Sequence, residues 1–119
     1  MLNILRRSLG TGVLTTGYPA VEEVAPPAYR GQLMLDPTRC TGDGACARVC
    51  PSQAISVAHD DNGWGWQLDD ARCVFCALCV DACPTDALQM SNEFELATHT
   101  QSDLLTCVTF RHRAEEQQP

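Results

Sequence analysis

The residues best able to do chemistry in this chain form two runs of closely spaced thiols. The later run is Cys73, Cys76, Cys79 and Cys83, followed by Pro84. The earlier run stands 33 residues before it and has an aspartate in one cysteine position: Cys40, Asp43, Cys46 and Cys50, followed by Pro51. Thiolates packed this densely suit the corners of a cuboidal iron–sulfur cluster. Each proline fixes its φ and lacks an N–H, so it turns the chain away after the last cysteine. The spacing therefore predicts two iron–sulfur sites, one of them altered at Asp43.

Disulfides and zinc are the two other uses for eight cysteines. The spacings crowd the thiols too tightly for a disulfide framework, and a Cys-Pro ending has no role in one. Zinc sites usually pair two close cysteines with a distant second pair. Iron–sulfur binding is therefore favoured over both, and thiolate-bound clusters imply a reducing compartment, hence the cytoplasm.

Both runs match the motif of the bacterial two-cluster ferredoxins, which the chain resembles over residues 31–91. Short matches on either side of the two motifs further indicate that the chain resembles the small iron–sulfur subunit of formate hydrogenlyase and related membrane-bound [NiFe] hydrogenases. The matching flanks are Gly10-Thr11-Gly12, Gly17-Tyr18-Pro19, Tyr29-Arg30-Gly31 and Phe94-Glu95-Leu96-Ala97. The chain is also similar to the two-cluster subunit of respiratory complex I.

The resemblance implies how the ligands are shared, because the fourth cysteine of each motif ligates the other cluster in two-cluster ferredoxins. One set, for an ordinary [4Fe-4S] cluster, would be Cys50, Cys73, Cys76 and Cys79. The altered set would be Cys40, Asp43, Cys46 and Cys83. Exchange of Cys50 and Cys83 would tie the two halves of the domain together.

Asp43 leaves the state of the altered cluster open, since the duplicate places Cys76 there. The carboxylate is a harder oxygen donor that could ligate a fourth iron. Alternatively the corner is empty, which gives [3Fe-4S], or water completes it. Some ferredoxins resembling this one carry Asp at this position with a labile iron. The expected cofactors are thus one [4Fe-4S] cluster and a second that is [3Fe-4S] or Asp-ligated [4Fe-4S].

The duplication extends beyond the cysteines and predicts the fold. Leu35-Asp36 before the first motif matches Leu68-Asp69 before the second, and Ala54-Ile55 matches Ala87-Leu88. Each half reads as strand, cluster loop, short helix and strand. The predicted class is α+β, a pseudo-twofold βαββαβ ferredoxin-like iron–sulfur domain with N- and C-terminal tails. Its strands are expected at 32–35, 55–58, 65–68 and 88–90, and its helices at 45–49 and 78–82.

Three segments are expected: residues 1–30 as an N-terminal helix and extended docking arm, 31–91 as the ferredoxin domain, and 92–119 as a C-terminal tail. Leu2, Leu5 and Leu9 share one helical face with Met1, which suits contact with a membrane surface or a partner. The apolar side chains of residues 92–110 are expected to pack on this core or on another subunit.

Three further side chains carry expectations of their own. Trp64 and Trp66 flank a glycine, so both should point to one face of a strand that packs on the core or on a partner. Cys107 lies outside both motifs and is expected to be a small buried hydrophobe.

Charge and hydropathy limit the partners. The formal net charge is −7, which excludes a nucleic-acid partner that would want a basic face. No stretch reaches the ~18 apolar residues of a membrane span. Arg6-Arg7 raises the alternative of a twin-arginine export signal, but the residues that follow are only weakly apolar.

The sequence therefore predicts a non-catalytic electron-relay subunit, cytoplasmic and peripheral to the inner face of the cell membrane. Its partners would be other subunits of a redox complex, either a [NiFe] hydrogenase or a quinone-reducing arm. A free soluble ferredoxin and an iron–sulfur redox sensor are the alternatives.

Overall fold

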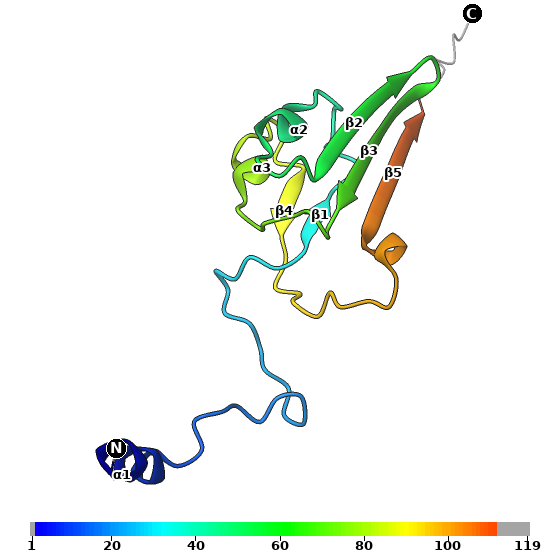
Figure 1. The fold of residues 1–119 in the computed structure, drawn as a ribbon. Coiled ribbons are helices and arrows are strands. Elements are labelled where there is room, and N and C mark those ends of the chain that lie inside the picture. The colour runs from blue at the N-terminus through cyan, green and yellow to red at the C-terminus, as the bar shows by residue number, and fades with distance from the viewer. Residues whose placement is uncertain (1, 112–119) are drawn as a thin grey trace, which may run out of the picture.

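A computed structural model describes residues 2–111 of the chain; Met1 and residues 112–119 lie outside the described part. The core runs in the order β1 (Leu33–Leu35), α2 (Ala45–Val49), β2 (Ile55–Asp60), β3 (Gly63–Asp69), α3 (Leu78–Asp81) and β4 (Leu88–Met90). Both short helices lie on the same side of the strands (Figure 1). The mixed helix-and-sheet class is as predicted, and so are the places of these six elements along the chain.

Two small antiparallel sheets hold the core together. β1 pairs with β4, so the first strand of one half lies beside the last strand of the other, with Leu33 opposite Met90. β2 and β3 form a hairpin with Ile55 opposite Leu68. The strand ends repeat one contact: Asp36 N–H donates to Ala87 O, and Asp69 N–H donates to Ala54 O, both at 2.8 Å. Equivalent residues of the two sequence repeats therefore make equivalent bonds.

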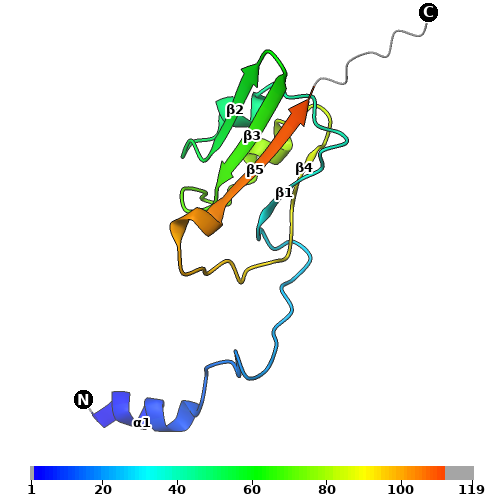
Figure 2. The same ribbon diagram turned by 90° about the vertical axis from the view of Figure 1, so that its right-hand side faces the viewer.

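The C-terminal segment adds a strand that the sequence did not predict. After a 3₁₀ turn at Gln101–Leu104, β5 (Leu105–Arg111) pairs along the full length of β3 (Figure 2). Of the two packing modes expected for this segment, the described residues show packing on the chain's own core. Phe110 stacks on Trp64 with ring centroids 3.6 Å apart.

Cys107 contradicts its prediction, because its side chain is exposed rather than buried. In β5, Val108 and Phe110 pack against the core. Side chains alternate between the two faces of a strand, so Cys107 and Thr109 face away. The prediction of burial was wrong because it treated this segment as a tail without strand periodicity.

The core is small and lies between the strands and the two short helices. Its largest fully buried side chains are Trp66, Leu68 and Leu88. Burying each such side chain contributes roughly 1.5–3 kcal/mol. With so few of them, a domain of this size commonly depends on bound metal for stability.

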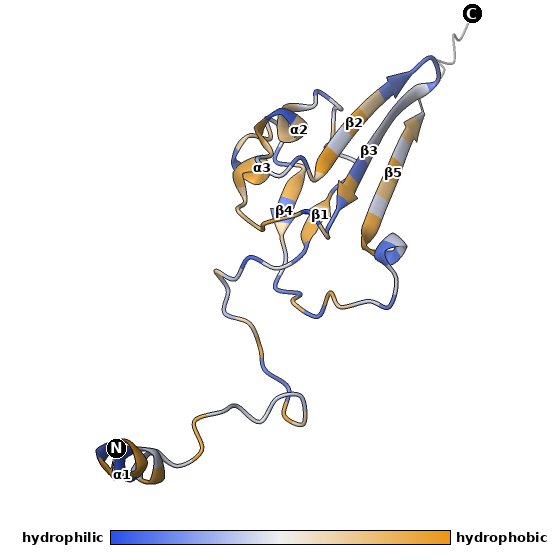
Figure 3. Ribbon diagram, in the orientation of Figure 1, coloured by the Kyte–Doolittle hydropathy of each residue, from blue (hydrophilic) through white to orange (hydrophobic). Residues whose placement is uncertain are grey.

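Residues 2–30 extend away from the core, and the described chain measures 86 × 28 × 28 Å along its principal axes. Helix α1 (Leu2–Thr11) lies at the far end and carries both apolar and polar side chains, none of them buried (Figure 3). The helix expected at the N-terminus is thus present.

The arm joins the core beside the segment that follows β4. Gly31 N–H donates to Ser91 O at 2.8 Å, and Gln32 N–H donates to Glu93 O at 2.9 Å. Further out, Tyr18 and Tyr29 both pack against Phe94, with ring centroids 5.9 and 6.2 Å away. Three of the four flanking motifs that carried the resemblance therefore meet in space, whereas Gly10-Thr11-Gly12 lies apart at the end of α1.

Candidate iron–sulfur centres

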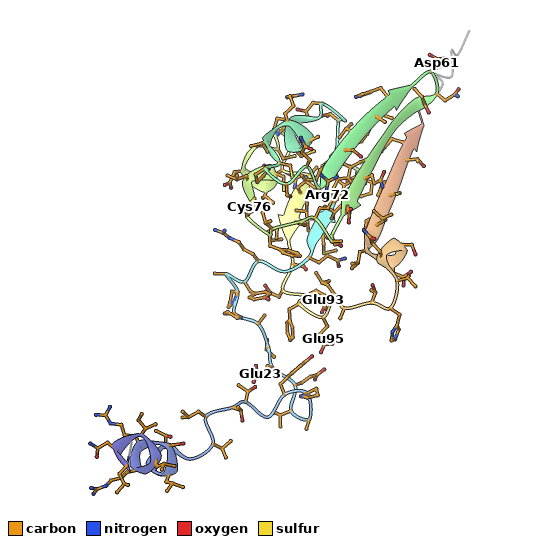
Figure 4. The ribbon with its side chains drawn as sticks, viewed as in Figure 1. Glu23, Asp61, Arg72, Cys76, Glu93 and Glu95 are labelled. Carbon is orange, nitrogen blue, oxygen red and sulfur yellow. The ribbon has the colours of Figure 1, made fainter. Side chains whose placement is uncertain are left out.

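The eight residues predicted as cluster ligands line two separate cavities, four in each. The first cavity, here called the all-cysteine cavity, is walled by Cys50, Cys73, Cys76 and Cys79. The second, here called the Asp43 cavity, is walled by Cys40, Asp43, Cys46 and Cys83. Each cavity receives one cysteine from the opposite motif, which is the exchange that the resemblance implied. Cys76 lies on the α3 side of the core, far from the hairpin turn at Asp61 (Figure 4).

The two ligand loops follow the same backbone path. Gly42 and Gly44 have φ of 73° and 72°, and their counterparts Phe75 and Ala77 have φ of 51° and 67°. The left-handed region is open to glycine and costs other residues of order 1–3 kcal/mol. Asp43 therefore stands at the same point of its loop as Cys76, between two left-handed residues.

Hydrogen bonds to sulfur are also duplicated. Ala54 N–H donates to Cys50 Sγ and Ala87 N–H donates to Cys83 Sγ, both at 3.3 Å. The hydroxyls of Ser52 and Thr85 lie 3.6 and 3.7 Å from the same two sulfurs. These N–H groups point at the sulfur atom, which carries the negative charge of a thiolate. They therefore favour the ionised form that binds metal.

The pKa values of the thiols differ in the same way in both repeats. Burial would raise the pKa of Cys50 and Cys83, but the hydrogen bonds outweigh it and lower both values. Burial raises the pKa of Cys46 and, with the charge of Cys73 adding to it, raises the pKa of Cys79 to about 11. Metal binding displaces the thiol proton, and burial makes Cys46 and Cys79 harder to ionise than Cys50 and Cys83.

Both Asp43 and Cys76 accept a backbone hydrogen bond from an arginine, Cys76 from Arg30 at 3.2 Å, but only Asp43 also has a side-chain ion pair. Its carboxylate lies 3.9 Å from the Arg48 guanidinium, and Arg48 also donates to the backbone oxygen of Asp43 at 2.8 Å. The equivalent of Arg48 in the second repeat is Asp81. Asp43 thus carries a partly exposed ion pair that the Cys76 position does not have.

Two aromatic side chains in the cavity walls complete the sites. Phe75 lines the all-cysteine cavity and is half-buried there. Trp66 lines the Asp43 cavity. Sequence reasoning assigned Trp66 to packing and passed over Arg48. Aligning the repeats would have drawn attention to both, since Leu33 and Asp81 stand at the corresponding positions.

The side chains present fit iron–sulfur clusters. Four soft or mixed donors surround each cavity, with N–H groups directed at the sulfurs, as such clusters require. Within residues 2–111, no three His, Cys, Asp or Glu side chains gather around one point that could hold a single metal ion. The donors instead stand around the wall of each cavity.

Comparison with known proteins gives the class of this site. Residues 39–87 match the family of the 4Fe-4S dicluster domain. The resemblance drawn from the motifs is therefore confirmed over that segment of the chain.

Two curated relatives and one solved structure extend the match. The chain is 39% identical over 107 residues to formate hydrogenlyase subunit 6 of Escherichia coli (strain K12), which covers 88% of this chain and 59% of the relative. It is 37% identical over 62 residues to NADH-quinone oxidoreductase subunit I 2 of Anaeromyxobacter dehalogenans (strain 2CP-C), which covers 48% and 24%. A chain of the membrane-bound sulfane sulfur reductase, an archaeal respiratory membrane complex, superposes with a TM-score of 0.65 at 31% identity, covering 83% of this chain and 55% of that one.

The chain thus spans 59% and 24% of the lengths of the two curated relatives. Among its described residues, no helix has the length and apolar character needed to cross a bilayer.

Proposed function

We propose that this chain relays single electrons through two iron–sulfur clusters as a subunit of a membrane-associated redox complex. The observation that carries the proposal is the sorting of all eight candidate ligands into two cavities of four within one small core. Bound clusters of this kind accept and release one electron at a time. The chain itself would break no substrate bond; its residues hold the clusters, exclude water and set their potentials.

The all-cysteine cavity would hold an ordinary [4Fe-4S] cluster on Cys50, Cys73, Cys76 and Cys79. The Asp43 cavity would hold either [3Fe-4S] or an Asp-ligated [4Fe-4S] cluster on Cys40, Asp43, Cys46 and Cys83. The shared backbone path of the two loops supports ligation by Asp43. Its ion pair with Arg48 supports a fourth iron that is easily lost.

The domain plan is proposed as a pseudo-twofold βαββαβ arrangement spanning residues 31–91. The element order and the matched bonds at Asp36 and Asp69 support it. Strand β5 would then be an addition from the tail, residues 92–119, to one of the two sheets.

Residues 1–30 are proposed as a docking arm. Its apolar side chains have no cover within the described chain: Leu2 and Leu9 are each 84% exposed and Val24 is 93% exposed. Exposed apolar surface of this extent is typical of a segment that packs on a partner or a membrane surface. The site of docking would be the cytoplasmic inner face of the membrane, and the partners a [NiFe] hydrogenase or a quinone-reducing arm, by analogy with the relatives.

Anaerobic affinity purification from native membranes tests the proposal. The full chain would carry a C-terminal tag, and co-purifying subunits would be identified by mass spectrometry. Recovery with a [NiFe] large subunit or a quinone-reducing arm is the expected result. Recovery as a small protein without partners would instead establish a mobile ferredoxin.

A matched variant tests the arm separately. Leu5→Glu with Leu9→Glu places charge on the apolar face of α1, far from both cavities, so cluster content should stay unchanged while subunit recovery falls. Full recovery of subunits with this variant would show that α1 is not the docking element.

A further inference from the structure

Trp66 leaves a strong hydrogen-bond donor without an acceptor. The side chain is 2% exposed, and its indole Nε1 is buried with no hydrogen-bond partner among the described residues. A buried donor left unsatisfied costs roughly 1–3 kcal/mol, and buried polar groups in native proteins are nearly always paired. An acceptor for this N–H is therefore expected in the assembled protein.

The surroundings of Trp66 indicate what that acceptor is. Trp66 is one of the residues that wall the Asp43 cavity, together with Cys40, Cys46 and Cys83. The buried indole therefore borders a cavity lined by thiols, whose sulfurs can accept its N–H.

The other half of the domain provides an internal control. Leu33 stands three residues before Asp36, as Trp66 stands three residues before Asp69. Leu33 walls the all-cysteine cavity but has no polar group to offer. The two repeats therefore put an N–H donor beside one set of ligands and a purely apolar side chain beside the other.

We propose that Trp66 donates its indole N–H to a sulfur of the cluster in the Asp43 cavity, either Cys46 Sγ or a cluster sulfide, and so raises that cluster's reduction potential. The proposal rests on the cluster assignment made above. Reduction adds negative charge to the sulfurs, so an N–H aimed at them stabilises the reduced form more than the oxidised one. Trp66 would thereby favour reduction of the cluster in the Asp43 cavity and leave the all-cysteine cluster unaffected.

The test is a potentiometric titration of the full chain, reconstituted anaerobically with both clusters and followed by EPR. Trp66→Phe keeps a flat ring and removes the donor. We expect the ratio of reduced to oxidised cluster in the Asp43 cavity to fall roughly tenfold at a fixed ambient potential, which is about 59 mV for a one-electron couple. The potential of the all-cysteine cluster should not change.

Trp64→Phe is the matched control. It removes the other tryptophan of the chain, from the same strand, at a residue that stacks on Phe110 and does not wall the Asp43 cavity. Unchanged potentials are expected for this control. An equal shift in both variants would overturn the proposal in favour of a general effect on the sheet.

A second measurement avoids any loss of packing in Trp66→Phe. In the Trp64→Phe protein, 5-fluorotryptophan enters only at residue 66, where its more acidic N–H is a stronger donor of similar shape. The potential of the Asp43 cluster should then rise. Both clusters present with no shift in either experiment would refute the role of Trp66 and leave the relay function standing. Absence of iron and sulfide from the Asp43 cavity of the unaltered chain would refute the relay function itself.

Discussion

The two cavities of this domain have nearly the same backbone but differ in the side chains that decide their chemistry. The left-handed residues fall at equivalent positions, Gly42 with Phe75 and Gly44 with Ala77. The hydrogen bonds to Cys50 and Cys83 are the same to within 0.1 Å. Asp43, Trp66 and Arg48 replace a cysteine, a leucine and an aspartate of the other half. The comparison teaches that a loop built to present four ligands keeps its path when one ligand is exchanged.

The largest effect is expected from the ligand exchange itself. Asp43→Cys should give the Asp43 cavity four thiolates and therefore a second stable [4Fe-4S] cluster, because thiolate is the softer donor that iron–sulfur clusters prefer. Iron and sulfide analysis after mild oxidation should find about one more iron per chain than in the unaltered protein.

The reverse exchange is its control. Cys76→Asp places a carboxylate at the equivalent point of the other loop while Asp43 remains, so both cavities should lose iron and the content should fall by about one more iron per chain than in the unaltered protein. Iron content that is the same in all three proteins after oxidation would contradict a labile corner at Asp43.

Crowding behind the Asp43 loop gives the next effect. A Cβ added at Gly42 would lie 2.6 Å from Cδ2 of Trp64, so Gly42→Ala should lower the free energy of unfolding by about 1–3 kcal/mol through overpacking. Its left-handed backbone adds roughly 1 kcal/mol. Urea unfolding of the cluster-loaded protein measures the sum.

Gly44→Ala separates the two causes. Its φ is also left-handed, at 72°, but the added Cβ would meet only Arg48 Nη1 at 3.5 Å and Val57 Cβ at 4.0 Å. It should show the backbone cost without the crowding. Equal losses in the two variants would mean that Trp64 moves aside freely.

Relief of backbone strain in the all-cysteine loop should be smaller and of opposite sign. Ala77 caps α3 with φ of 67°, so Ala77→Gly removes a cost of about 1–2 kcal/mol and adds back roughly 0.4–1 kcal/mol of unfolded-state entropy. A net gain of about 0.5 kcal/mol in urea unfolding is expected. Ala47→Gly, inside α2, should instead destabilise; a loss in both variants would show that Ala77 carries no strain.

The smallest effect concerns the ion pair beside the altered corner. Arg48→Gln frees the Asp43 carboxylate, so iron should leave the Asp43 cavity more slowly on oxidation. The pair is largely exposed, with side-chain exposures of 71% and 42%, and such pairs contribute about 1 kcal/mol or less. A slowing of no more than roughly fivefold is expected. Arg39→Gln is the control, since Arg39 precedes Cys40 but pairs with Asp86 at 3.6 Å. Faster iron loss from Arg48→Gln would reverse the assigned role.

The structure of residues 31–91 could be predicted because the same sequence pattern occurs there twice. Each strand and helix of one repeat is checked by its counterpart, and the helices expected at 45–49 and 78–82 were placed to within one residue. The ligand sets came from the family resemblance, and the structure gathers those same residues into two cavities.

The unrepeated parts were harder to predict for physical reasons. In β5 the alternation of apolar and polar side chains is clear only from Val108 onward, and the strand conformation of 105–111 depends on the free edge of β3. Nothing in the sequence of residues 105–111 itself indicates that the edge of β3 is free to pair. The position of Cys107 depended on the same pairing and was missed with it.

Trp66 was predicted to lie on a strand face that packs on the core or on a partner, and its ring lies in the core. What its N–H faces could not be read from spacing, because it depends on the cavity formed by a different segment of chain.

The joint between the arm and the core has a consequence for the speed of electron delivery. Tyr18 and Tyr29 bind Phe94 on the segment beyond β4, and Tyr18 donates to Glu95, near the acidic side chains Glu23 and Glu93 (Figure 4). A partner that binds α1 would therefore hold the clusters through a short linker, because the arm is already fixed to the core side at Tyr18. Short tethers hold a second contact at millimolar effective concentration. A weak, quickly reversible contact between the cluster-bearing core and the partner would then be enough for turnover, because the arm keeps the two surfaces near each other between contacts.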